Sequence, residues 1–458
     1  MASFKRIFRT ILNVNQIIVD DFKITYEIRR GLAKAPVLNV YVRPMKSQRE
    51  RCPVCGKKRP IYDTRPIMRC WRAPDFNGVK VLLWYCPCRV SCPEHGVHQE
   101  KLPWTITDNY SYTRDFILLA ALIAMKETRA SAAIRLRTSW QTASNCVSLA
   151  LKILEPDLTD RYNDLVNIGI DETSYKKGHK YITTVVNHET NTVVWMHEGH
   201  DVETLSLFFE ALTQKQRENI GTVSGDAAPW IRVCMKKYIP HATFCLDKFH
   251  VSQWFVSALD EVRRTEWRAM KDEIRTVNKA LRELPEDASD EKAKLGEALK
   301  KAKEKASTMK NARYAICKNP DNLTPNQKLM LQHVVETDSK VTEARNLKEQ
   351  LRMGLSLTEE KEARSVVEDF IQKASQSGLE PFRKLSRSIR EHLDDLMNTI
   401  RSGLSNAAIE ANNNKIKLLL RKAFGFRNLK NLTSVVMLGC SRLRITLPNR
   451  GGLAISPF

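Results

Sequence analysis

The segment between residues 161 and 255 has the clearest alternation of apolar and polar positions in the chain. Short apolar runs rich in β-branched residues are separated by polar residues, and one longer run has the spacing of a helix. In chain order, the segments are a strand at 168–170, strands at 181–186 and 192–196 joined by a polar hairpin loop at 187–191, a helix at 205–212 and a strand at 221–225. This order predicts an α/β unit built on one sheet.

Two acidic residues directly follow apolar strands of this expected sheet. Asp171 comes after the first strand and Asp226 after the fourth. The strand order is that of a ribonuclease H-like sheet, in which the first and fourth strands are neighbours, so we expect the two carboxylates to share a pocket. Glu172 is set aside because it points to the other face if the strand persists. Asp247, which ends a fifth strand, is the chief rival for a metal-binding role.

The remaining patterns divide the chain into further regions. Its 458 residues are enough for roughly two to four domains. Between 256 and 400, Lys, Glu, Ala, Leu, Arg and Gln dominate with helical spacing, which indicates a large helical insertion. The expected order is N-terminal strands at 1–45, a small zinc-binding domain at 46–104, an all-α helix-turn-helix domain at 105–160, the first part of the catalytic domain at 161–255, the insertion at 256–400, and the second part of the catalytic domain with a C-terminal tail at 401–458.

A pattern of short helices precedes the sheet. Residues 116–123 and 129–136 have helical spacing, and a tight polar turn at 138–140 leads into another helix at 141–149. A short helix, a tight turn and a second helix can place a recognition helix in the major groove of DNA. The side chains expected to contact DNA from this last helix are Gln141, Thr142, Ser144 and Asn145. An ordinary three-helix bundle is the alternative interpretation.

The charge of the chain indicates an anionic partner. There are 74 Lys and Arg residues against 52 Asp and Glu, a formal net charge of +22, and such an excess favours nucleic acid. Non-specific contact with nucleic acid is the alternative. Between Arg401 and Arg450 the only acid in the sequence is Glu410. In helical spacing, one face holds Glu410, Asn414, Lys417 and Arg421, and another holds Ile409, Ile416 and Leu420. The basic residues expected to contact DNA here are Lys415, Lys417, Arg421, Lys422 and Arg427.

Glu410 supplies a third carboxylate beside Asp171 and Asp226. Three carboxylates suit hard, oxygen-preferring cations, so we expect Mg²⁺ or Mn²⁺ as the catalytic cofactor. Two such ions, about 3.5–4 Å apart, can activate an attacking oxygen and stabilise a leaving oxygen in an in-line displacement at phosphorus. The sequence therefore predicts a metal-dependent enzyme that acts on phosphodiester bonds.

The cysteines are clustered. Of 11 in the chain, six lie between Cys52 and Cys92, which indicates metal binding in a reducing compartment rather than a disulfide scaffold. Segments 52–56 and 92–96 repeat the order ligand, proline, any residue, ligand, glycine. The ligands that this repeat predicts for a structural zinc ion are Cys52, Cys55, Cys92 and His95. Cys86 or Cys88 can replace either later ligand, and His98 and Cys70 are weaker candidates. Unligated buried cysteines are the alternative.

No membrane partner is expected. No stretch approaches the roughly 18–20 apolar residues of a membrane span, and no signal peptide is recognised at the basic N-terminal segment. We therefore expect a cytoplasmic protein.

Together these motifs resemble the bacterial insertion-sequence transposases of the ISL3 family, which are of the DDE type. The resemblance covers nearly the whole chain, in order. The segments that carry it are 52–56, 92–97, 169–172 with 177–179, Asp226, 247–250, and 409–417 with 424–428. It implies a ribonuclease H-like catalytic domain split by a helical insertion, with Asp171, Asp226 and Glu410 as the catalytic triad.

The resemblance also implies an activity and partners. Members of such a family bind the terminal inverted repeats of their element and catalyse metal-dependent cleavage and strand transfer on double-stranded DNA. Bringing two element ends together implies a homo-oligomer, at least a dimer on DNA, associated with the bacterial nucleoid. Two alternatives stay open: a zinc and helix-turn-helix DNA-binding regulator whose α/β domain is inert, and a nuclease that cuts DNA without joining it.

Overall fold

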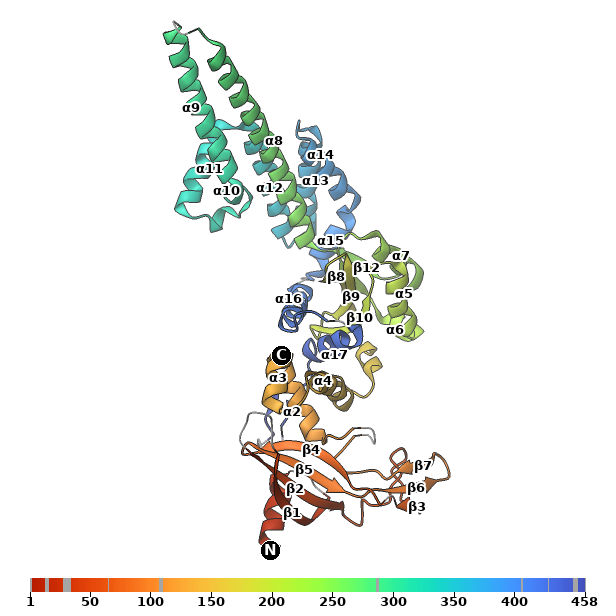
Figure 1. The fold of residues 1–458 in the computed structure, drawn as a ribbon. Helices are drawn as coiled ribbons and strands as arrows, with labels where there is room; N and C mark the ends of the chain where they lie inside the picture. Colours follow the sequence, from red (N-terminus) through yellow and green to blue (C-terminus); the bar gives the residue numbers. More distant parts are fainter. Residues whose placement is uncertain are drawn as a thin grey trace.

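The chain folds into an elongated molecule with β-structure at one end and long helices at the other (Figure 1). The computed structural model describes residues 2–12, 16–27, 34–64, 66–106, 110–285, 288–404, 407–426, 428–447 and 452–457. The N-terminal sheets lie at the bottom of the view, a mixed sheet lies in the middle, and helices extend to the top. Within these ranges, no helix combines the length and the apolar character that crossing a bilayer requires.

Two sheets form the N-terminal end of the molecule. The larger has the order β1-β2-β5-β4, and its strands are β1 (Ile17–Glu27), β2 (Ala35–Pro44), β4 (Arg69–Phe76) and β5 (Val79–Tyr85). The smaller has the order β3-β6-β7, with β3 (Ile61–Thr64), β6 (Cys88–Cys92) and β7 (Gly96–Gln99). Because β2 pairs with β5 in parallel, strands from residues 1–45 and from the cysteine region share one sheet.

A helix that the alternation pattern did not predict precedes β1. In α1 (Ala2–Ile11), apolar residues at positions 4, 7, 8 and 11 have the spacing of one helix face. The ring of Phe8 packs against the ring of Phe22 on β1, with centroids 4.7 Å apart. The strands expected within residues 1–45 correspond to β1 and β2. The N-terminal region is therefore a helix packed on strands, not strands alone.

Three helices connect the N-terminal sheets to the mixed sheet: α2 (Arg114–Lys126), α3 (Arg129–Leu136) and α4 (Trp140–Leu154), followed by a short 3-10 helix, η1 (Leu158–Tyr162). The side chains of Thr113, Thr128 and Ser139 cap the three α-helices, because each accepts a hydrogen bond from a first-turn amide. Arg137, with a positive φ of 51°, ends α3 and opens the tight turn into α4. This arrangement agrees with the expected helices and turn.

The mixed sheet has five strands in the order β10-β9-β8-β11-β12. Its strands are β8 (Asn167–Lys176), β9 (Lys180–Asn187), β10 (Thr192–Glu198), β11 (Thr222–Gly225) and β12 (Thr243–Leu246). β8 pairs with β9 antiparallel and with β11 in parallel. The first and fourth strands in chain order are therefore neighbours, as expected from the likeness of the element order to a ribonuclease H-like sheet.

Each face of this sheet packs on a different set of helices. Ile168, Ile170 and Val223 share a core with residues of α5 (Val202–Ala211) and α7 (Pro229–Tyr238); α6 (Gln214–Asn219) lies between these helices in sequence. Ile182 and Val193 share a second core with α2, α4 and the two C-terminal helices, α16 (Ala407–Lys422) and α17 (Leu429–Gly439). The chain ends in the short pair β13 (Ile445–Thr446) and β14 (Ala454–Ile455).

A large helical region lies between β12 and α16 and extends away from the sheet (Figure 1). Its first helix begins at Lys248, directly after β12, so the helices start before residue 256. The helices are α8 (Lys248–Glu283), α9 (Ser289–Asn311), α10 (Arg313–Cys317), α11 (Pro325–Thr337), α12 (Ser339–Ser356), α13 (Glu360–Gln376), α14 (Glu380–Glu391) and α15 (Leu393–Ser402), with the 3-10 helix η2 (Pro320–Asn322) after α10. The hydroxyl of Thr399 on α15 donates to the carbonyl of Leu246, at 2.7 Å, and so attaches this region to the sheet.

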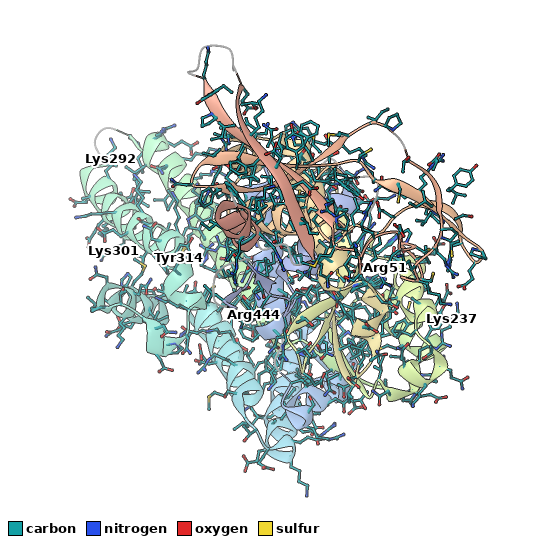
Figure 2. All side chains as sticks on the ribbon, turned by 90° about the horizontal axis from the view of Figure 1, so that it is seen from below. Arg51, Lys237, Lys292, Lys301, Tyr314 and Arg444 are labelled. Carbon is teal, nitrogen blue, oxygen red and sulfur yellow. The ribbon has the colours of Figure 1, made fainter. Side chains whose placement is uncertain are left out.

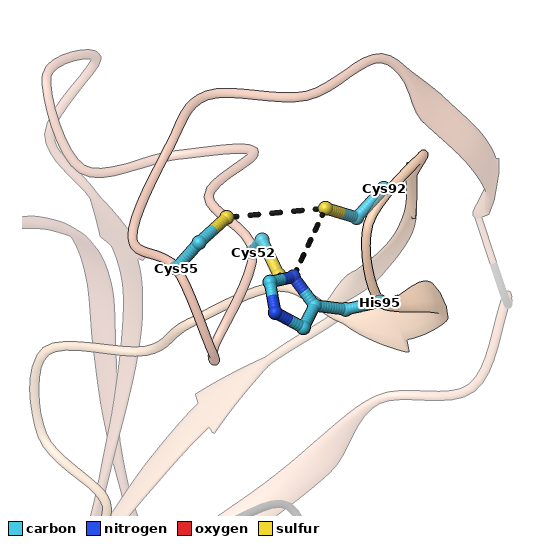
Figure 3. Close-up of side chains that lie close together, drawn as sticks. All are labelled: Cys52, Cys55, Cys92 and His95. Carbon is cyan, nitrogen blue, oxygen red and sulfur yellow. Dashed lines mark hydrogen bonds between the residues drawn. The ribbon is translucent and has the colours of Figure 1, made fainter.

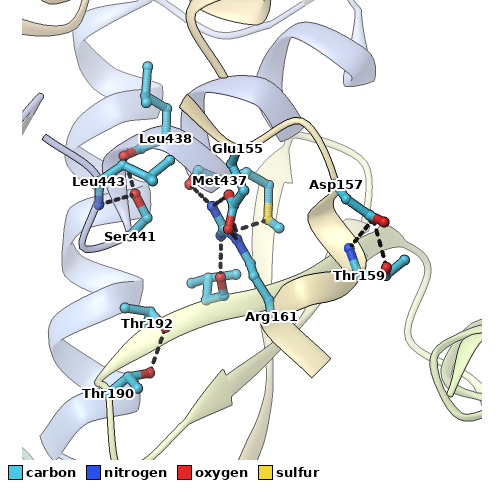
Figure 4. A network of polar contacts seen from close by, with 11 residues as sticks. Glu155, Asp157, Thr159, Arg161, Thr190, Thr192, Met437, Leu438, Ser441 and Leu443 are labelled. Carbon is cyan, nitrogen blue, oxygen red and sulfur yellow. Dashed lines mark hydrogen bonds and ion pairs between the residues drawn. The ribbon is translucent and has the colours of Figure 1, made fainter. Parts of the chain in front are cut away.

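Arg161 joins three parts of the chain beside the mixed sheet (Figure 4). Its guanidinium donates to both carboxylate oxygens of Glu155, to the carbonyl of Val193 on β10 at 2.7 Å, and to the carbonyl of Met437 on α17 at 2.8 Å. Its side chain is only 7% exposed. A planar cation with several fixed donors can satisfy all three acceptors at once. Arg161 therefore fixes the segment after α4 against both the sheet and α17.

Replacing Arg161 with alanine is expected to lower the stability of the fold by roughly 3–5 kcal/mol, because it removes a buried cation that binds the half-buried Glu155 carboxylate, which is 16% exposed, and two carbonyls. The free energy can be followed by urea unfolding. Arg275→Ala is the matched control: Arg275 pairs with Asp272, but their side chains are 78% and 69% exposed, and such pairs contribute about 0–1 kcal/mol. Equal losses in the two variants would contradict the role given to Arg161.

Candidate functional site

Four side chains of the cysteine region gather at one point (Figure 3). The Sγ atom of Cys92 lies 3.8 Å from Sγ of Cys55 and 3.4 Å from Nδ1 of His95, and Sγ of Cys52 lies 3.9 Å from the same nitrogen. All four ligand atoms lie within 4.8 Å of one another. Three sulfurs and one imidazole nitrogen at such separations form a group that can hold a metal ion.

Two tight turns bring these ligands together. The amide of Gly56 donates to the carbonyl of Cys52 at 2.9 Å, and the amide of His95 donates to the carbonyl of Cys92 at 3.3 Å. The turns end at Gly56 and Gly96, whose φ angles of +68° and +79° fall in the left-handed region that glycine adopts without strain. The repeat seen in the sequence is therefore a repeat of backbone turns.

The surroundings of two of the sulfurs favour the thiolate. A backbone hydrogen bond from Lys57 lowers the pKa of the Cys55 thiol, and the nearby Arg59 guanidinium lowers it further. At Cys92, burial acts in the opposite direction, but hydrogen bonds from the Glu94 and His95 amides outweigh it, so the pKa is also lowered. Burial raises the pKa of Cys52. Thiolates are the form of cysteine that binds metal ions.

The structure distinguishes between the ligand sets that the sequence left open. Within the described residues, Cys86, Cys88, Cys70 and His98 lie outside the four-residue group. Cys88 has another environment, since burial and the neighbouring Glu100 carboxylate raise the pKa of its thiol to about 12. The geometry therefore favours Cys92 and His95 over Cys86 and Cys88.

Glu100 was not singled out from the sequence, although it organises the region around this cluster. Its side chain is fully buried. It accepts hydrogen bonds from the amide of Glu50 at 2.8 Å, the hydroxyl of Tyr85 at 2.8 Å and the amide of Cys88 at 3.1 Å. A carboxylate that joins the segment before Cys52 to the start of β6 fixes the two turns relative to each other. Only the fold reveals this, because the three donors are far apart in the sequence.

The three acids expected in the active site come from β8, the end of β11, and α16. Asp226 directly follows β11, as predicted, and one of its oxygens accepts a hydrogen bond from the amide of Ala228 at 3.1 Å. Asp171 is not at the end of its strand, because β8 continues to Lys176 through pairing with β9. β11 pairs with β8 only as far as Ser224 opposite Gly169, so both acids lie just beyond the last pair.

A cleft of about 690 Å³ opens between β8, the start of α8 and α16. Asp171 and Glu410, distant in the sequence, both line it. Asp226 is not among its lining residues, but its charge reaches the cleft. Burial raises the pKa of Asp171, and the like charge of Asp226 adds to this shift. Lys248 on α8 and Lys417 on α16 also line this cleft. Their cationic side chains can contact a phosphate there.

The acids do not yet form a closed metal site. Among the described residues, the cluster of Cys52, Cys55, Cys92 and His95 is the only group of three or more His, Cys, Asp or Glu residues whose ligand atoms all lie within 4.8 Å of one another. The carboxylates of Asp171, Asp226 and Glu410 are thus not all within 4.8 Å of one another. Glu410 is exposed on α16, so the cleft is open on its side.

Glu172 lines the cleft as well, contrary to the expectation that it points away. β8 does persist through Glu172, but β11 no longer pairs with it at this point, so the cleft reaches both faces of the strand. Burial raises the pKa of Glu172, and the charges of Asp226 and Asp171 raise it further. Asp247, the rival candidate, also lines the cleft. It caps α8, since its carboxylate accepts from the amide of Phe249 at 2.8 Å.

Asn413 ties the helix of Glu410 to the strand of Asp171. The Asn413 side-chain amide donates to the carboxylate of Asp171, and its carbonyl accepts from the hydroxyl of Thr173 at 3.0 Å. Asn413 is 8% exposed. The sequence offered one signal that was not used: Asn412 and Asn413 are polar residues on the packing face of α16, and both are buried.

Gly169 lets α16 approach β8 closely. A Cβ atom at this position would lie 2.2 Å from the Cδ1 atom of Ile409. Gly169→Ala is therefore expected to move α16 away from the strand, to cost about 1–3 kcal/mol of stability, and to slow any reaction that needs Asp171 and Glu410 together. Thermal unfolding and a DNA-cleavage assay measure the two effects.

Gly221→Ala is the matched control, because a Cβ there meets no atom within 4 Å. The double variant Gly169→Ala/Ile409→Ala removes the colliding methyl group and should recover part of the activity. If Gly169→Ala has the same thermal stability and cleavage rate as Gly221→Ala, the close approach of α16 to β8 is not needed for function.

On α4, only part of the expected DNA-contacting set is available. Gln141 and Asn145 are exposed and lie one turn apart on the same face. Thr142 is half-buried, and its hydroxyl is bonded to the hydroxyls of Ser139 at 3.0 Å and Tyr112 at 3.2 Å. Ser144 is 8% exposed and faces the helical core, so the prediction that it reaches DNA is wrong for this conformation.

The faces of α16 agree with the helical spacing of the sequence. Glu410, Asn414, Lys417 and Arg421 are exposed, while Ile409 and Ile416 are buried. Three further residues are half-buried: Leu420, which was expected on the apolar face, and Lys415 and Lys422, which were expected to contact DNA. Arg427 lies outside the described residues. Cations also lie elsewhere on the molecule, as the labelled Arg51, Lys237, Lys292, Lys301 and Arg444 show (Figure 2).

Comparisons with known proteins identify the family of this chain. The DDE family of the ISL3 type, described as transposase, matches residues 168–436, a range that contains Asp171, Asp226 and Glu410. The chain belongs to this family of transposases, enzymes that cleave and transfer DNA.

Two relatives show how far the similarity extends. The chain is 35% identical, over 97% of both lengths, to the transposase for insertion sequence element IS1557 of Mycobacterium tuberculosis. It is 23% identical to the transposase for insertion sequence element IS1001 of Bordetella parapertussis, over 85% of this chain and 88% of the relative.

Proposed function

We propose that this DNA transposase cuts and joins element ends with Asp171, Asp226 and Glu410 as ligands of two Mg²⁺ or Mn²⁺ ions. The observation that carries the proposal is the shared cleft: Asp171 and Glu410 line it together with two lysines, and Asn413 bonds the helix of one to the strand of the other. When bound, such ions activate an attacking oxygen and stabilise a leaving oxygen at phosphorus. Oxygen ligands of this kind fit those ions.

The side chains of the cleft have distinct tasks in this proposal. Asp171, held by Asn413, is the fixed ligand. Its carboxylate is half-buried, and this desolvation favours neutralisation by a cation. Glu410 is exposed and closes on the site when DNA and cations are present. Lys248 and Lys417 hold the phosphate from the cleft walls. The three acids are not all within 4.8 Å of one another in the free protein, which suits ligands that are divided between two ions about 3.5–4 Å apart.

The fold that we propose for the catalytic region is ribonuclease H-like, interrupted by the helical region between β12 and α16. The order β10-β9-β8-β11-β12, with three antiparallel strands followed by two parallel ones, supports this assignment. Asp171 and Asp226 lie just beyond the last residue pair between β8 and β11. This position of the two acids also supports a ribonuclease H-like fold.

The N-terminal regions are proposed to select the element ends. A zinc ion held by Cys52, Cys55, Cys92 and His95 would stabilise the turns of the cysteine region. The exposed Gln141 and Asn145 of α4 suit contacts to base edges, so α4 is the proposed recognition helix for terminal inverted repeats. Because two ends must be joined to one target, we propose at least a dimer on DNA, acting at the nucleoid.

One assay separates this proposal from its alternatives. The protein is incubated with Mg²⁺, a labelled linear DNA that carries an element end, and a supercoiled target plasmid. We expect the labelled strand to be cut at the element end and joined to the plasmid. Cut ends that never join would support a nuclease, and binding without any cut would support a regulator; either result overturns the proposal.

A further inference from the structure

Phe424 is the most exposed large apolar side chain of the described residues, at 91% of its full surface. It stands just beyond the last residue of α16, Lys422. Its φ angle is +52°, in the left-handed region that side chains with a Cβ atom rarely adopt. The fold thus holds a phenylalanine in a strained conformation and buries almost none of its ring.

The backbone around Phe424 is fixed. The amide of Phe424 donates to the carbonyl of Arg421 at 3.1 Å, and the amide of Gly425 donates to the carbonyl of Leu420 at 3.0 Å. These two bonds form a Schellman closure of the helix, in which the left-handed position is usually glycine. Two residues later Phe426 is 8% exposed and packs in the core of α2, α4 and α17. The chain therefore returns to the core at once and leaves Phe424 directed outwards at a set position.

The surface that leads to Phe424 is cationic. The exposed face of α16 runs from Glu410 past Asn414 to Lys417 and Arg421. Neither of these two cations forms an ion pair with another described residue. A helix face with two cations and an exposed aromatic ring at its end suits DNA, because DNA has anionic phosphates outside and stacked bases inside. An apolar protein surface would leave the same cations without partners.

We propose that Phe424 is a positioning residue that enters the base stack of element-end DNA lying along the basic face of α16 and unstacks one base step. Apolar side chains that insert between bases open and kink DNA, and aromatic rings stack on any base. Phe424 lies about 20 Å along the axis from Glu410, from the rise of about 1.5 Å per residue. The opened step is then about six base pairs from the cut. The inference rests on the proposed function, since it takes α16 to lie on the cleaved DNA.

Phe424→Gly is the decisive variant, because it separates a structural role from a DNA-opening one. Glycine adopts the left-handed conformation freely, so the thermal midpoint of this variant should equal or exceed that of the parent. Its cleavage of intact element-end DNA should fall by roughly tenfold or more. Phe424→Trp keeps a flat ring and should keep most of the activity. Tyr314→Ala is the matched control: Tyr314 is a 72% exposed aromatic residue on α10 (Figure 2) and should be without effect.

The opened step can be observed directly. The probe is a set of duplex element ends with 2-aminopurine at successive positions near the cut, because the fluorescence of this base rises when it is unstacked. We expect one position to respond with the parent protein and with Phe424→Trp, and no position to respond with Phe424→Gly. A duplex that already contains a mismatch at the responding position should restore cleavage by Phe424→Gly.

Two outcomes overturn the inference. One is a Phe424→Gly protein that cleaves intact duplex as fast as the parent. The other is a loss of cleavage without any change in 2-aminopurine fluorescence and without rescue by the mismatch, as expected if Phe424 contacts a second copy of the chain. Failure of the proposed function gives a different result, because the parent protein itself would then cut neither intact nor mismatched ends.

Discussion

Replacing Asp171 with asparagine will lower the rate of element-end cleavage about a thousandfold or more, while binding of the same DNA remains within a few-fold. Asparagine keeps the shape of the side chain but removes the charge that holds a cation, and metal ions contribute several kcal/mol to stabilising charge at a transferring phosphoryl group. Each 1.36 kcal/mol corresponds to a factor of about ten in rate. Single-turnover cleavage in Mg²⁺ and a gel-shift titration measure the two quantities.

The comparison variants make this result specific. Glu410→Gln should show a similar loss, and the double variant should be little worse than either single one, because ligands of one metal site act as a unit. Asp272→Asn is the control for the same chemical change: Asp272 is 69% exposed and pairs with Arg275 on the surface of α8, so its rate should match that of the parent. If Asp171→Asn is correctly folded and still cleaves at a comparable rate, the triad assignment is wrong.

Removing one of the proposed zinc ligands is expected to unfold the cysteine region and to abolish the proposed preference for element ends. For structural zinc sites the apparent binding free energy is about 10–16 kcal/mol, and it acts directly on folding. Cys55→Ser is therefore expected to lose the bound zinc, to expose residues 46–104 to protease, and to bind element-end and random DNA equally. Zinc content by mass spectrometry of the native protein, limited proteolysis and competition binding check these three effects.

Cys86→Ser is the matched control, because Cys86 lies outside the cluster in the described structure. It should keep one zinc ion per chain and its preference for element ends. Loss of zinc in Cys86→Ser together with retention in Cys55→Ser would reverse the ligand assignment. Retention in both would exclude the site.

Much of the site was accessible from the sequence because it depends on local patterns. The turns of the cysteine region repeat a five-residue spacing, and the cluster found in the structure consists of the four residues that this spacing brings together. The alternation pattern located the strands, and the likeness of their order to a ribonuclease H-like sheet gave the expectation that β8 and β11 are neighbours, as they are in the structure. The exposed and buried faces of α16 follow from helical period alone.

The remaining features could not be predicted because they join residues that are far apart in the chain. The hydrogen bond from Asn413 to Asp171 and the bonds of Arg161 to β10 and α17 depend on how helices dock on the sheet. Burial of Ser144 depends on which face of α4 meets the core. The presence of Glu172 in the cleft depends on where the pairing of β11 ends, which strand alternation does not specify.

The shared core of α2, α4, α16 and α17 has a consequence for how the enzyme chooses its cut. The helix proposed to read bases and the helix that carries Glu410 are mounted on one block of packed side chains, reinforced by the 2.9 Å hydrogen bond between Ser148 and Ser434. In the proposed complex, neither helix shifts along DNA without the other. The distance between the recognised bases and the attacked phosphate is then set by the protein. If the recognised sequence is displaced by one base pair, about 3.4 Å along a strand, the cut moves by the same amount.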